Sequence, residues 1–334
     1  MSPTRAAGRA ILLAAILCVL AGVQAQGPAP APPRQAMVPG GALPETTLRR
    51  LLLVDGVRVG SRIVAVGDGG TIALTDDDGA TWRRAAAPAA PLLTSVTFAD
   101  AKHGWAVGHD TVILASEDGG ESWALQYSAP AEQRPLLSVL FLDPQRGIAV
   151  GAYGAYLETT DGGRTWNGRK VLPEDKHLNA IVRAGPARLL IFGEEGTILA
   201  SSNEGRDWKK VASPYKGSLF GGVVAADGAV VAFGLRGKIY RSADGGETWA
   251  AVDNASTATL MGGTRLPDGA IVLAGGAGTV LVSRDDGRSF GPLATGTAKA
   301  LSKPLLGRPN AVMILGEGGA RMLPLPLARR TAVR

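Results

Sequence analysis

The octapeptide SADGGETW, residues 242–249, decides the fold, and related octapeptides occur five more times along the chain. They share the frame Ser/Thr-x-Asp-x-Gly-x-Ser/Thr-Trp, with small departures. A catalytic site needs its residues once, whereas a phrase that returns at intervals is typical of a structural repeat. The octapeptide therefore predicts a repeat architecture rather than an active site.

Extending the frame toward the N-terminus gives seven aligned lines, each of which starts at a glycine, 41 to 43 residues after the previous one. The glycines are Gly67, Gly108, Gly151, Gly193, Gly234, Gly275 and Gly316. In the second unit, four short runs of strand-forming residues (92–98, 104–108, 111–116 and 122–128) alternate with turn residues. Four strands in about 40 residues are typical of a propeller blade. We predict an all-β, seven-bladed β-propeller of four-stranded antiparallel blades over residues 46–327.

The seventh unit is incomplete. Pro324 stands where the other copies have Ser or Thr, and no aromatic residue follows it at the usual distance. We expect a strand from residues 37–50 to take the place of the missing fourth strand. The N- and C-terminal strands would then close the ring and leave no open sheet edge there.

The third place of each octapeptide is expected to fasten a hairpin turn, because a carboxylate there accepts N–H groups of its own turn. We expect the following glycine to need a positive φ and the aromatic residue to be buried between neighbouring blades. In the fourth copy Asn203 and Asp207 replace Asp and Thr, and asparagine serves in the same turn. The third places are Asp77, Asp118, Asp161, Asn203, Asp244 and Asp285, and the aromatic places are Trp82, Trp123, Trp166, Trp208, Trp249 and Phe290.

The N-terminus has the pattern of an export signal. Arg5 and Arg9 precede an apolar run over residues 10–22, and a small-residue cleavage pattern ends at Ala25. We expect a signal peptide over residues 1–25 and an exported mature protein, with an uncleaved membrane anchor as the alternative. The only cysteine, Cys18, lies in this segment, so the mature chain is expected to have no disulfide.

Residues 26–45 are rich in Pro, Ala and Gly and are interpreted as a linker, from which a segment starting at Met37 contributes an edge strand at most. Residues 328–334 are interpreted as a tail. No cofactor is expected, because the glycine-rich phrases lie between strands instead of opening a helix. No metal site is expected, because His103, His109 and His177 lack metal-ligand spacing.

Charge indicates a docking surface rather than a nucleic-acid site. The net charge of +6 is too mild to indicate nucleic-acid binding. In a propeller, the connections from fourth to first strands lie on the side opposite the octapeptide turns. We assign a basic face to the first side and an acidic rim to the second, and expect this face to bind an acidic protein surface or anionic headgroups. The alternative is that these basic residues only solvate exposed loops and bind no partner. The assigned residues are Arg83, Arg84, Arg134, Arg169, Lys170, Lys209, Lys210, Lys216 and Arg236.

The octapeptide resembles the Asp-box, also called the BNR repeat, which occurs in sialidases, some glycosidases, sorting receptors and the Ycf48/Hcf136 family. The whole chain is most similar to that last family, with an export signal, a short linker and seven uniform blades. The resemblance implies a non-enzymatic assembly factor of photosystem II that binds a membrane protein through an arginine-bearing face. It implies a location in the periplasm or the thylakoid lumen. In a bacterium without photosynthesis, it implies an envelope accessory role. We expect a monomer with no substrate.

A sialidase-like or other glycoside hydrolase is the alternative. Most glycosidases need a pair of carboxylates at the sugar, and sialidases use a tyrosine nucleophile and several arginines. None of the tyrosines, of which Tyr153 and Tyr156 are two, lies in a recognisable nucleophile setting, and the uniform blades leave little length for catalytic loops. We therefore predict that the protein is not an enzyme and that it has no catalytic residues.

Overall fold

The computed structural model describes residues 36–326. The predicted signal peptide, the first part of the linker and the tail over residues 328–334 lie outside the described residues. No helix between residues 36 and 326 is long and apolar enough to cross a membrane.

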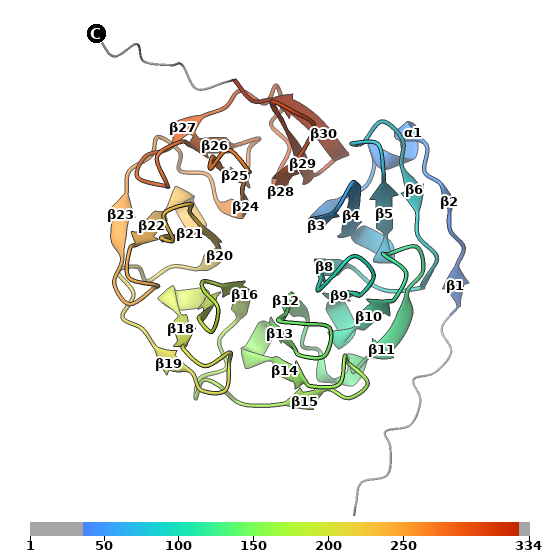
Figure 1. The fold of residues 1–334 in the computed structure, drawn as a ribbon, viewed down its shortest axis with the longest axis horizontal. Helices are drawn as coiled ribbons and strands as arrows, with labels where there is room; N and C mark the ends of the chain where they lie inside the picture. The colour runs from blue at the N-terminus through green and yellow to red at the C-terminus, as the bar shows by residue number, and fades with distance from the viewer. Residues whose placement is uncertain (1–35, 327–334) are drawn as a thin grey trace, which may run out of the picture. The chain divides into compact units, whose positions relative to one another are not determined.

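Residues 53–324 form seven antiparallel sheets arranged around a central channel, which confirms the predicted β-propeller (Figure 1). The innermost strands are β3 (Leu53–Val59), β8 (Leu93–Phe98), β12 (Leu136–Phe141), β16 (Leu178–Arg183), β20 (Leu219–Val224), β24 (Leu260–Arg265) and β28 (Leu301–Leu306). The second strands are β4 (Arg62–Gly67), β9 (Gly104–Gly108), β13 (Gly147–Gly151), β17 (Leu189–Gly193), β21 (Val230–Gly234), β25 (Ile271–Gly275) and β29 (Ala311–Gly316).

The outer half of each blade begins with a third strand. These strands are β5 (Ile72–Thr75), β10 (Ile113–Ser116), β14 (Tyr156–Thr159), β18 (Ile198–Ser201), β22 (Ile239–Ser242), β26 (Val280–Ser283) and β30 (Gly319–Pro324). Six blades add a short outer strand: β6 (Arg83–Arg84), β11 (Ala124–Tyr127), β15 (Asn167–Gly168), β19 (Lys209–Lys210), β23 (Ala250–Val252) and β27 (Gly291–Pro292). The octapeptide thus ends the third strand and leads into the outer one, as the sequence predicts.

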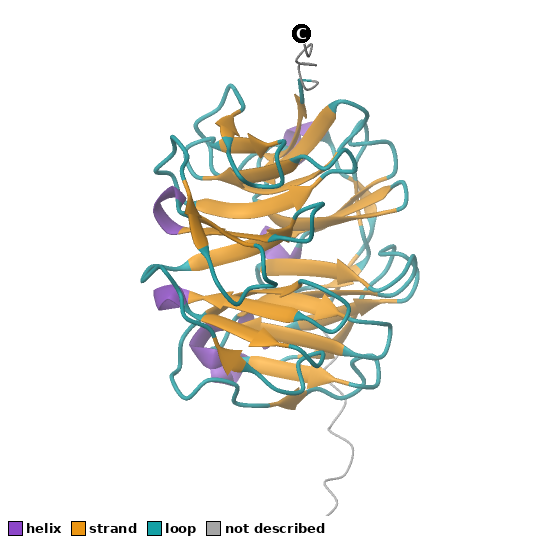
Figure 2. Cartoon of the chain, turned by 60° about the vertical axis from the view of Figure 1, so that its left-hand side comes forward, coloured by secondary structure: helices purple, strands orange, loops and turns teal. Residues whose placement is uncertain are grey.

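The two sides of the ring carry different connections, which Figure 2 shows gathered at the two ends of the strands. One side carries the links from outer strands to the next innermost strand and the seven turns between second and third strands, five of which form 3-10 helices. We call it the connector face. The helices are η1 (Asp68–Gly70), η2 (His109–Thr111), η4 (Ala152–Gly154), η5 (Glu194–Gly196) and η6 (Leu235–Gly237), with η3 (Pro130–Glu132) in a link. The opposite side carries the octapeptide turns, and we call it the Asp-box rim.

The connector-face turns follow one plan in all seven blades. Each innermost strand starts with a leucine that is at most 1% exposed, and the strand register shifts directly after it. A Cβ on the glycine that ends the second strand would lie 2.0 to 2.4 Å from the carbonyl oxygen just before that leucine. The same oxygen accepts the N–H of the residue after the glycine. Only glycine allows this approach, which explains the glycine that recurs with every unit.

The N-terminal segment is placed differently from the prediction. β2 (Gly41–Ala42) pairs with β6, so that blade 1 has five strands, and β1 (Met37–Val38) pairs with β7 (Ala87–Pro88). Residues 37–45, assigned to the linker, therefore belong to the propeller. Blade 7 has three strands, and the predicted fourth strand from residues 37–50 is absent among the described residues. The prediction that the N- and C-terminal strands close the ring by pairing is therefore wrong.

The reason lies in residues 43–52. After β2 the chain leaves the sheet edge and forms α1 (Glu45–Leu48), and the carbonyl oxygen of Leu51 accepts N–H bonds from Gly318 and Gly319 at 3.0 and 2.9 Å. The segment therefore meets the tip of the β29–β30 hairpin and does not run beside β30. A cleft of about 740 Å³ remains between β30 and the octapeptide turn of blade 1.

Packing closes the ring in place of pairing. Leu43 and Leu48 of the N-terminal segment and Trp82 of blade 1 form one buried cluster with Leu305, Met313 and Leu315 of blade 7. The two chain ends meet as expected, but through apolar side chains, the two N–H bonds to Leu51 and one isolated bridge between Leu52 and Glu317.

Candidate functional site

The octapeptide turns are fastened by their carboxylates. Asp77 Oδ1 accepts the hydroxyl of Thr75 and the N–H of Thr81 at 2.8 and 2.9 Å, and its Oδ2 accepts the hydroxyl of Thr81 at 2.6 Å. The Thr75 hydroxyl in turn accepts the N–H of Gly79 at 2.8 Å. Asp118, Asp161, Asp244 and Asp285 make the same set of bonds. Every carboxylate oxygen of these five residues is occupied inside its own turn.

The glycine at the fifth place has a positive φ in all six copies, between 77° and 93°. The residue before it also has a positive φ, and in three copies it is not a glycine: Asp78, Glu204 and Asp286. Two successive left-handed residues turn the chain sharply, which confirms the predicted need for glycine at the fifth place.

The fourth copy keeps the turn by exchanging donor and acceptor. Asn203 Oδ1 accepts the Ser201 hydroxyl and the Asp207 N–H, both at 2.9 Å. Its Nδ2 donates to Asp207 Oδ2 at 2.8 Å, where the other copies have a hydroxyl that donates to Asp. The two departures from the frame therefore compensate each other.

Changing Asn203 to Asp alone should destabilise the protein although it restores the common residue. Two carboxylates would then meet and the Asp207 oxygen would lose its donor, which is expected to lower the free energy of unfolding by about 1 kcal/mol. The double variant Asn203→Asp with Asp207→Thr should return close to wild type in urea unfolding. Equal stability of the single and double variants would contradict this compensation.

The octapeptide aromatics pack between blades as predicted. Trp123 of blade 2 lies in one cluster with Val64 and Leu74 of blade 1, and Phe290 of blade 6 lies with Val231 of blade 5. The indole N–H groups of Trp82, Trp123 and Trp249 donate to the carbonyl oxygen of their own octapeptide glycine at 3.0 to 3.2 Å. The indole N–H of Trp208 donates to the hydroxyl of Tyr156 on the preceding blade at 3.3 Å. Each aromatic ring thus joins its turn to the blade before it.

The octapeptide carboxylates are expected to make the stability of the fold depend on pH. The hydroxyl of Thr81, followed by its backbone N–H, lowers the pKa of Asp77 from its usual 3.8 to about 2, and the Thr248 hydroxyl likewise lowers the pKa of Asp244. Because the folded pKa lies below the unfolded one, Asp77 stabilises the fold above about pH 4, and this contribution is lost as the pH falls toward about 2. We expect the midpoint of thermal unfolding to fall more steeply below pH 4 in wild type than in Asp77→Asn. The exposed connector residue Asp253, changed to Asn, serves as control and should keep the wild-type slope; an Asp77→Asn curve parallel to wild type would refute the prediction.

The candidate basic residues are divided between the two sides of the ring. Arg84, which reaches Thr71 Oγ1 at 3.3 Å, and Arg134, Lys170, Lys210, Lys216 and Arg236 belong to the connector face. Lys170 and Lys210 are paired with Asp175 and Glu174, each at 3.5 Å. Among the described residues, no ion pair is formed by Arg84, Arg134, Lys216 or Arg236.

Three candidates lie on the Asp-box rim, contrary to the prediction. Arg83 binds Asp76 and Glu121 at 2.9 and 2.6 Å. Lys209 binds Glu247 at 2.8 Å. Arg169 donates to the carbonyl oxygens of Gly205 and Arg206 and lies 5.1 Å from the ring centre of Tyr156. Arg83 and Lys209 directly follow the octapeptide aromatic and start the outer strand at the end nearest the turn. Arg169 follows the end of β15, and its guanidinium reaches the octapeptide turn of blade 4.

The Asp-box rim is therefore not simply acidic, as the sequence suggested. Arg62 joins Asp76 and Glu121 at 2.7 and 2.8 Å, next to Arg83. Other arginines on this side pair with rim carboxylates: Arg58 with Asp78, Arg146 with Glu204, Arg188 with Glu247, and Arg241 and Arg288 with Asp227. Some of these pairs lie within one blade and others join neighbouring blades, as Arg62 does with Glu121, and the rim charges largely compensate each other.

The three histidines do not form a common site among the described residues. His103 Nδ1 lies 2.7 Å from Asp100, and the His177 ring meets the edge of Tyr153. Across residues 36–326, no three His, Cys, Asp or Glu side chains are grouped so as to hold a metal ion.

The central channel holds a set of bonds that the sequence analysis did not identify. The residue after each buried leucine, at the register shift, lines the channel. In three blades this residue is polar and donates to the carbonyl oxygen of the next blade's leucine: Thr94 to Leu136 at 2.6 Å, Asn179 to Leu219 at 2.9 Å and Ser302 to Leu53 at 2.6 Å. The leucine that recurs near the start of every unit is the sequence signal that would have located this ring of residues.

Asp55 joins three blades at the point where the ring closes. Its Oδ2 accepts the Ser95 hydroxyl and the Val96 N–H of blade 2, both at 3.1 Å. Its Oδ1 lies 3.2 Å from the ammonium of Lys303 in blade 7, and the two side chains are 15% and 29% exposed. Similarly, Ser138 of blade 3 accepts the Ile181 N–H of blade 4 at 3.2 Å.

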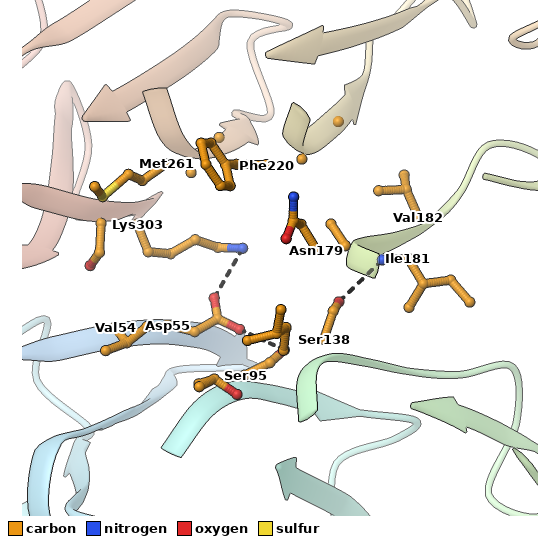
Figure 3. A pocket seen from close by; sticks show the side chains of 18 of the residues that line it. Val54, Asp55, Ser95, Ser138, Asn179, Ile181, Val182, Phe220, Met261 and Lys303 are labelled. Atoms are coloured by element: carbon orange, nitrogen blue, oxygen red, sulfur yellow. Dashed lines mark hydrogen bonds and ion pairs between the residues drawn. The ribbon is translucent and has the colours of Figure 1, made fainter. Parts of the chain in front are cut away.

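A pocket of about 490 Å³ occupies the connector-face half of this channel. Figure 3 shows the Lys303–Asp55 pair on one part of its wall, the Ser138–Ile181 bond on another, and Phe220 and Met261 together on a third. The pocket size is in the range that small ligands and peptide side chains occupy.

The chain also matches the model of a known protein family. The family model described as photosynthesis system II assembly factor YCF48 matches residues 74–136 and 126–273, which together exceed half of the chain. No curated protein is similar enough in sequence to count as a match.

Several solved structures share the fold. One described as YCF48 bound to D1 peptide is 22% identical with a TM-score of 0.67, over 86% of this chain and 96% of that chain. YCF48 from Cyanidioschyzon merolae is 18% identical with a TM-score of 0.65, over 86% and 99%. A GH74 xyloglucanase from Xanthomonas campestris is 12% identical with a TM-score of 0.66, over 85% of this chain and 53% of that one. At these identities the likenesses establish the propeller fold alone.

Proposed function

This chain belongs to the family described as photosynthesis system II assembly factor YCF48, and we propose on that basis that it is a non-enzymatic scaffold that binds a segment of a membrane protein. The family match carries the proposal, and the state of the octapeptide carboxylates supports it. A general acid or nucleophile needs a carboxyl group that reaches its substrate. All five octapeptide aspartates instead use both oxygens within their own turns.

A peptide segment is the form in which we propose that the partner binds. The structure described as YCF48 bound to D1 peptide shows that a related propeller holds a peptide. We propose that this chain binds the corresponding segment in a photosynthetic cell, and a segment of another envelope protein in a bacterium without photosynthesis. The protein would act as a monomer in the periplasm or the thylakoid lumen after removal of residues 1–25, and mass spectrometry of the mature N-terminus tests that cleavage.

The connector face is the proposed docking side. Arg134, Lys216 and Arg236 lie there without an ion pair to another described residue, so they retain charge for an acidic partner. The test is binding of the D1 peptide to the purified mature protein by isothermal titration calorimetry, in low and physiological salt. Charge reversal of these three residues to Glu should weaken binding, and the loss should shrink as salt rises.

The matched control reverses three exposed cations of the Asp-box rim, Lys102, Arg164 and Arg206. It changes the net charge by the same amount and should leave binding unchanged. Equal loss in both triple variants would reject the connector face as the docking side. Release of sugar from xyloglucan or a sialoside by the purified protein would contradict the non-enzymatic part of the proposal.

A further inference from the structure

Blades 5 and 6, which are neighbours, both carry a large apolar residue at the channel position of the register shift, and neither residue donates a hydrogen bond to the next blade. Phe220 of blade 5 and Met261 of blade 6 occupy the places where Thr94, Asn179 and Ser302 donate to the next blade. Met261 is 47% exposed, and Phe220 is half-buried. They come from the neighbouring strands β20 and β24 and stand together in the pocket (Figure 3).

An exposed methionine beside a phenylalanine is a common means of contacting apolar side chains, because methionine is flexible and polarisable and an aromatic ring offers a large apolar face. Leu137 and Val182 line the same pocket. In blades 5 and 6 this position donates no hydrogen bond to the next blade, unlike Thr94, Asn179 and Ser302, so inter-blade hydrogen bonding does not account for these two residues.

The remaining wall supplies polar groups with unused hydrogen-bonding capacity. Lys303 contacts Asp55 and has further N–H groups, the Ser138 hydroxyl accepts one bond and makes no donation among the described residues, and Asn179 keeps its carbonyl oxygen after its amide binds Leu219. These groups match the C=O and N–H groups of a peptide backbone. Lys303 and Asp55 neutralise each other, so the pocket favours an uncharged ligand over an ion.

We propose that the connector-face half of the central channel binds an extended, uncharged peptide segment of the partner, with a bulky apolar side chain seated between Phe220 and Met261. This inference rests on the proposed function, because it locates the peptide and states its chemistry. The volume of about 490 Å³ accommodates a large side chain together with the backbone on either side of it. The unpaired cations around the connector face would act on flanking parts of the partner, outside the channel.

The test uses substitutions that exist in other blades. Phe220→Asn and Met261→Thr place at these positions the residues found in blades 4 and 2, where they donate to the next blade. The double variant should therefore retain or raise the midpoint of thermal unfolding while its dissociation constant for the D1 peptide rises about tenfold or more. Met37→Thr removes another exposed methionine, in β1 outside the channel, and should change neither quantity.

A direct probe does not depend on the identity of the partner. In protein with ¹³C-labelled methionine methyl groups, the signal of Met261 is assigned by its loss in Met261→Thr. Titration with end-capped, uncharged hexapeptides that carry one central Phe or Leu should shift this signal, and the same peptides with Ala should not. The signal of Met37 should stay in place throughout.

The outcomes separate the two proposals. If the wild type binds the D1 peptide and the double variant binds it equally well, the channel inference is wrong and the proposed function stands. If the D1 peptide does not bind but the Phe and Leu hexapeptides shift Met261, the partner is wrong and the channel site stands. If no peptide shifts Met261, or if Met37 shifts equally, the channel inference is overturned.

Discussion

Replacing Trp82 with alanine is expected to lower the free energy of unfolding by about 3–5 kcal/mol, as for other buried aromatic residues. Trp82 is 7% exposed and packs with Leu305, Met313 and Leu315 of blade 7, as well as Leu43 and Leu48. Blades 7 and 1 share no sheet, and this buried cluster spans the interface at which the ring closes. The indole also donates to Gly79 at 3.2 Å.

Urea unfolding measures the loss, and hydrogen exchange shows where it acts. In Trp82→Ala, amides of both blade 7 and blade 1 should exchange faster, because opening at the closure releases both chain ends. Trp123→Ala is the matched control. It removes a ring of the same size, 3% exposed, from an interface that the chain also crosses, and should speed exchange in blades 1 and 2 only. Unchanged exchange in blade 7 of Trp82→Ala would show that the ring is closed by other contacts.

Replacing Asp55 with alanine is expected to cost about 2–3 kcal/mol of unfolding free energy. The change leaves the Ser95 hydroxyl and the Val96 N–H without their acceptor and the partly buried Lys303 ammonium without its counter-charge. Removing one member of such a pair is more costly than removing both, because the remaining charge stays desolvated.

Adding Lys303→Met to Asp55→Ala tests that explanation. The double variant should recover part of the lost stability in urea unfolding, because the unpaired charge is gone and methionine fills similar space. Lys303→Met alone should cost less than Asp55→Ala, since Asp55 keeps its two other donors. A double variant less stable than Asp55→Ala would mean that Lys303 stabilises the ring by packing and not through Asp55.

The sequence was sufficient for the fold and for the turns because both depend on short-range patterns. The octapeptide contains its own donors and acceptors: Thr75, Asp77, Gly79 and Thr81 bind one another within seven residues. The glycine at the fifth place and the exchange of roles at Asn203 and Asp207 follow from the same local chemistry. A period of 41 to 43 residues then fixes how many such units the chain contains.

The side of the ring on which a charge lies was predicted less well. Arg83, Arg169 and Lys209 were assigned to the connector face because they follow the octapeptide and precede the next blade. Arg83 and Lys209 begin their outer strands beside carboxylates of the Asp-box rim, and Arg169, just after β15, donates to a carbonyl oxygen there. A shift of a few residues along the chain moves a side chain from one face to the other, because each outer strand is only two to four residues long.

The sequence by itself thus determined the number of blades, the strands in most of them and the local bonds of every octapeptide turn, since those contacts join residues close together in the chain. Only the tertiary structure decided how the ring closes and which residues face the channel. Those features depend on contacts between residues about 40 to 250 positions apart, such as Thr94 with Leu136 and Ser302 with Leu53. The strand pattern alone does not fix such distant contacts, because they depend on how one blade is set against the next.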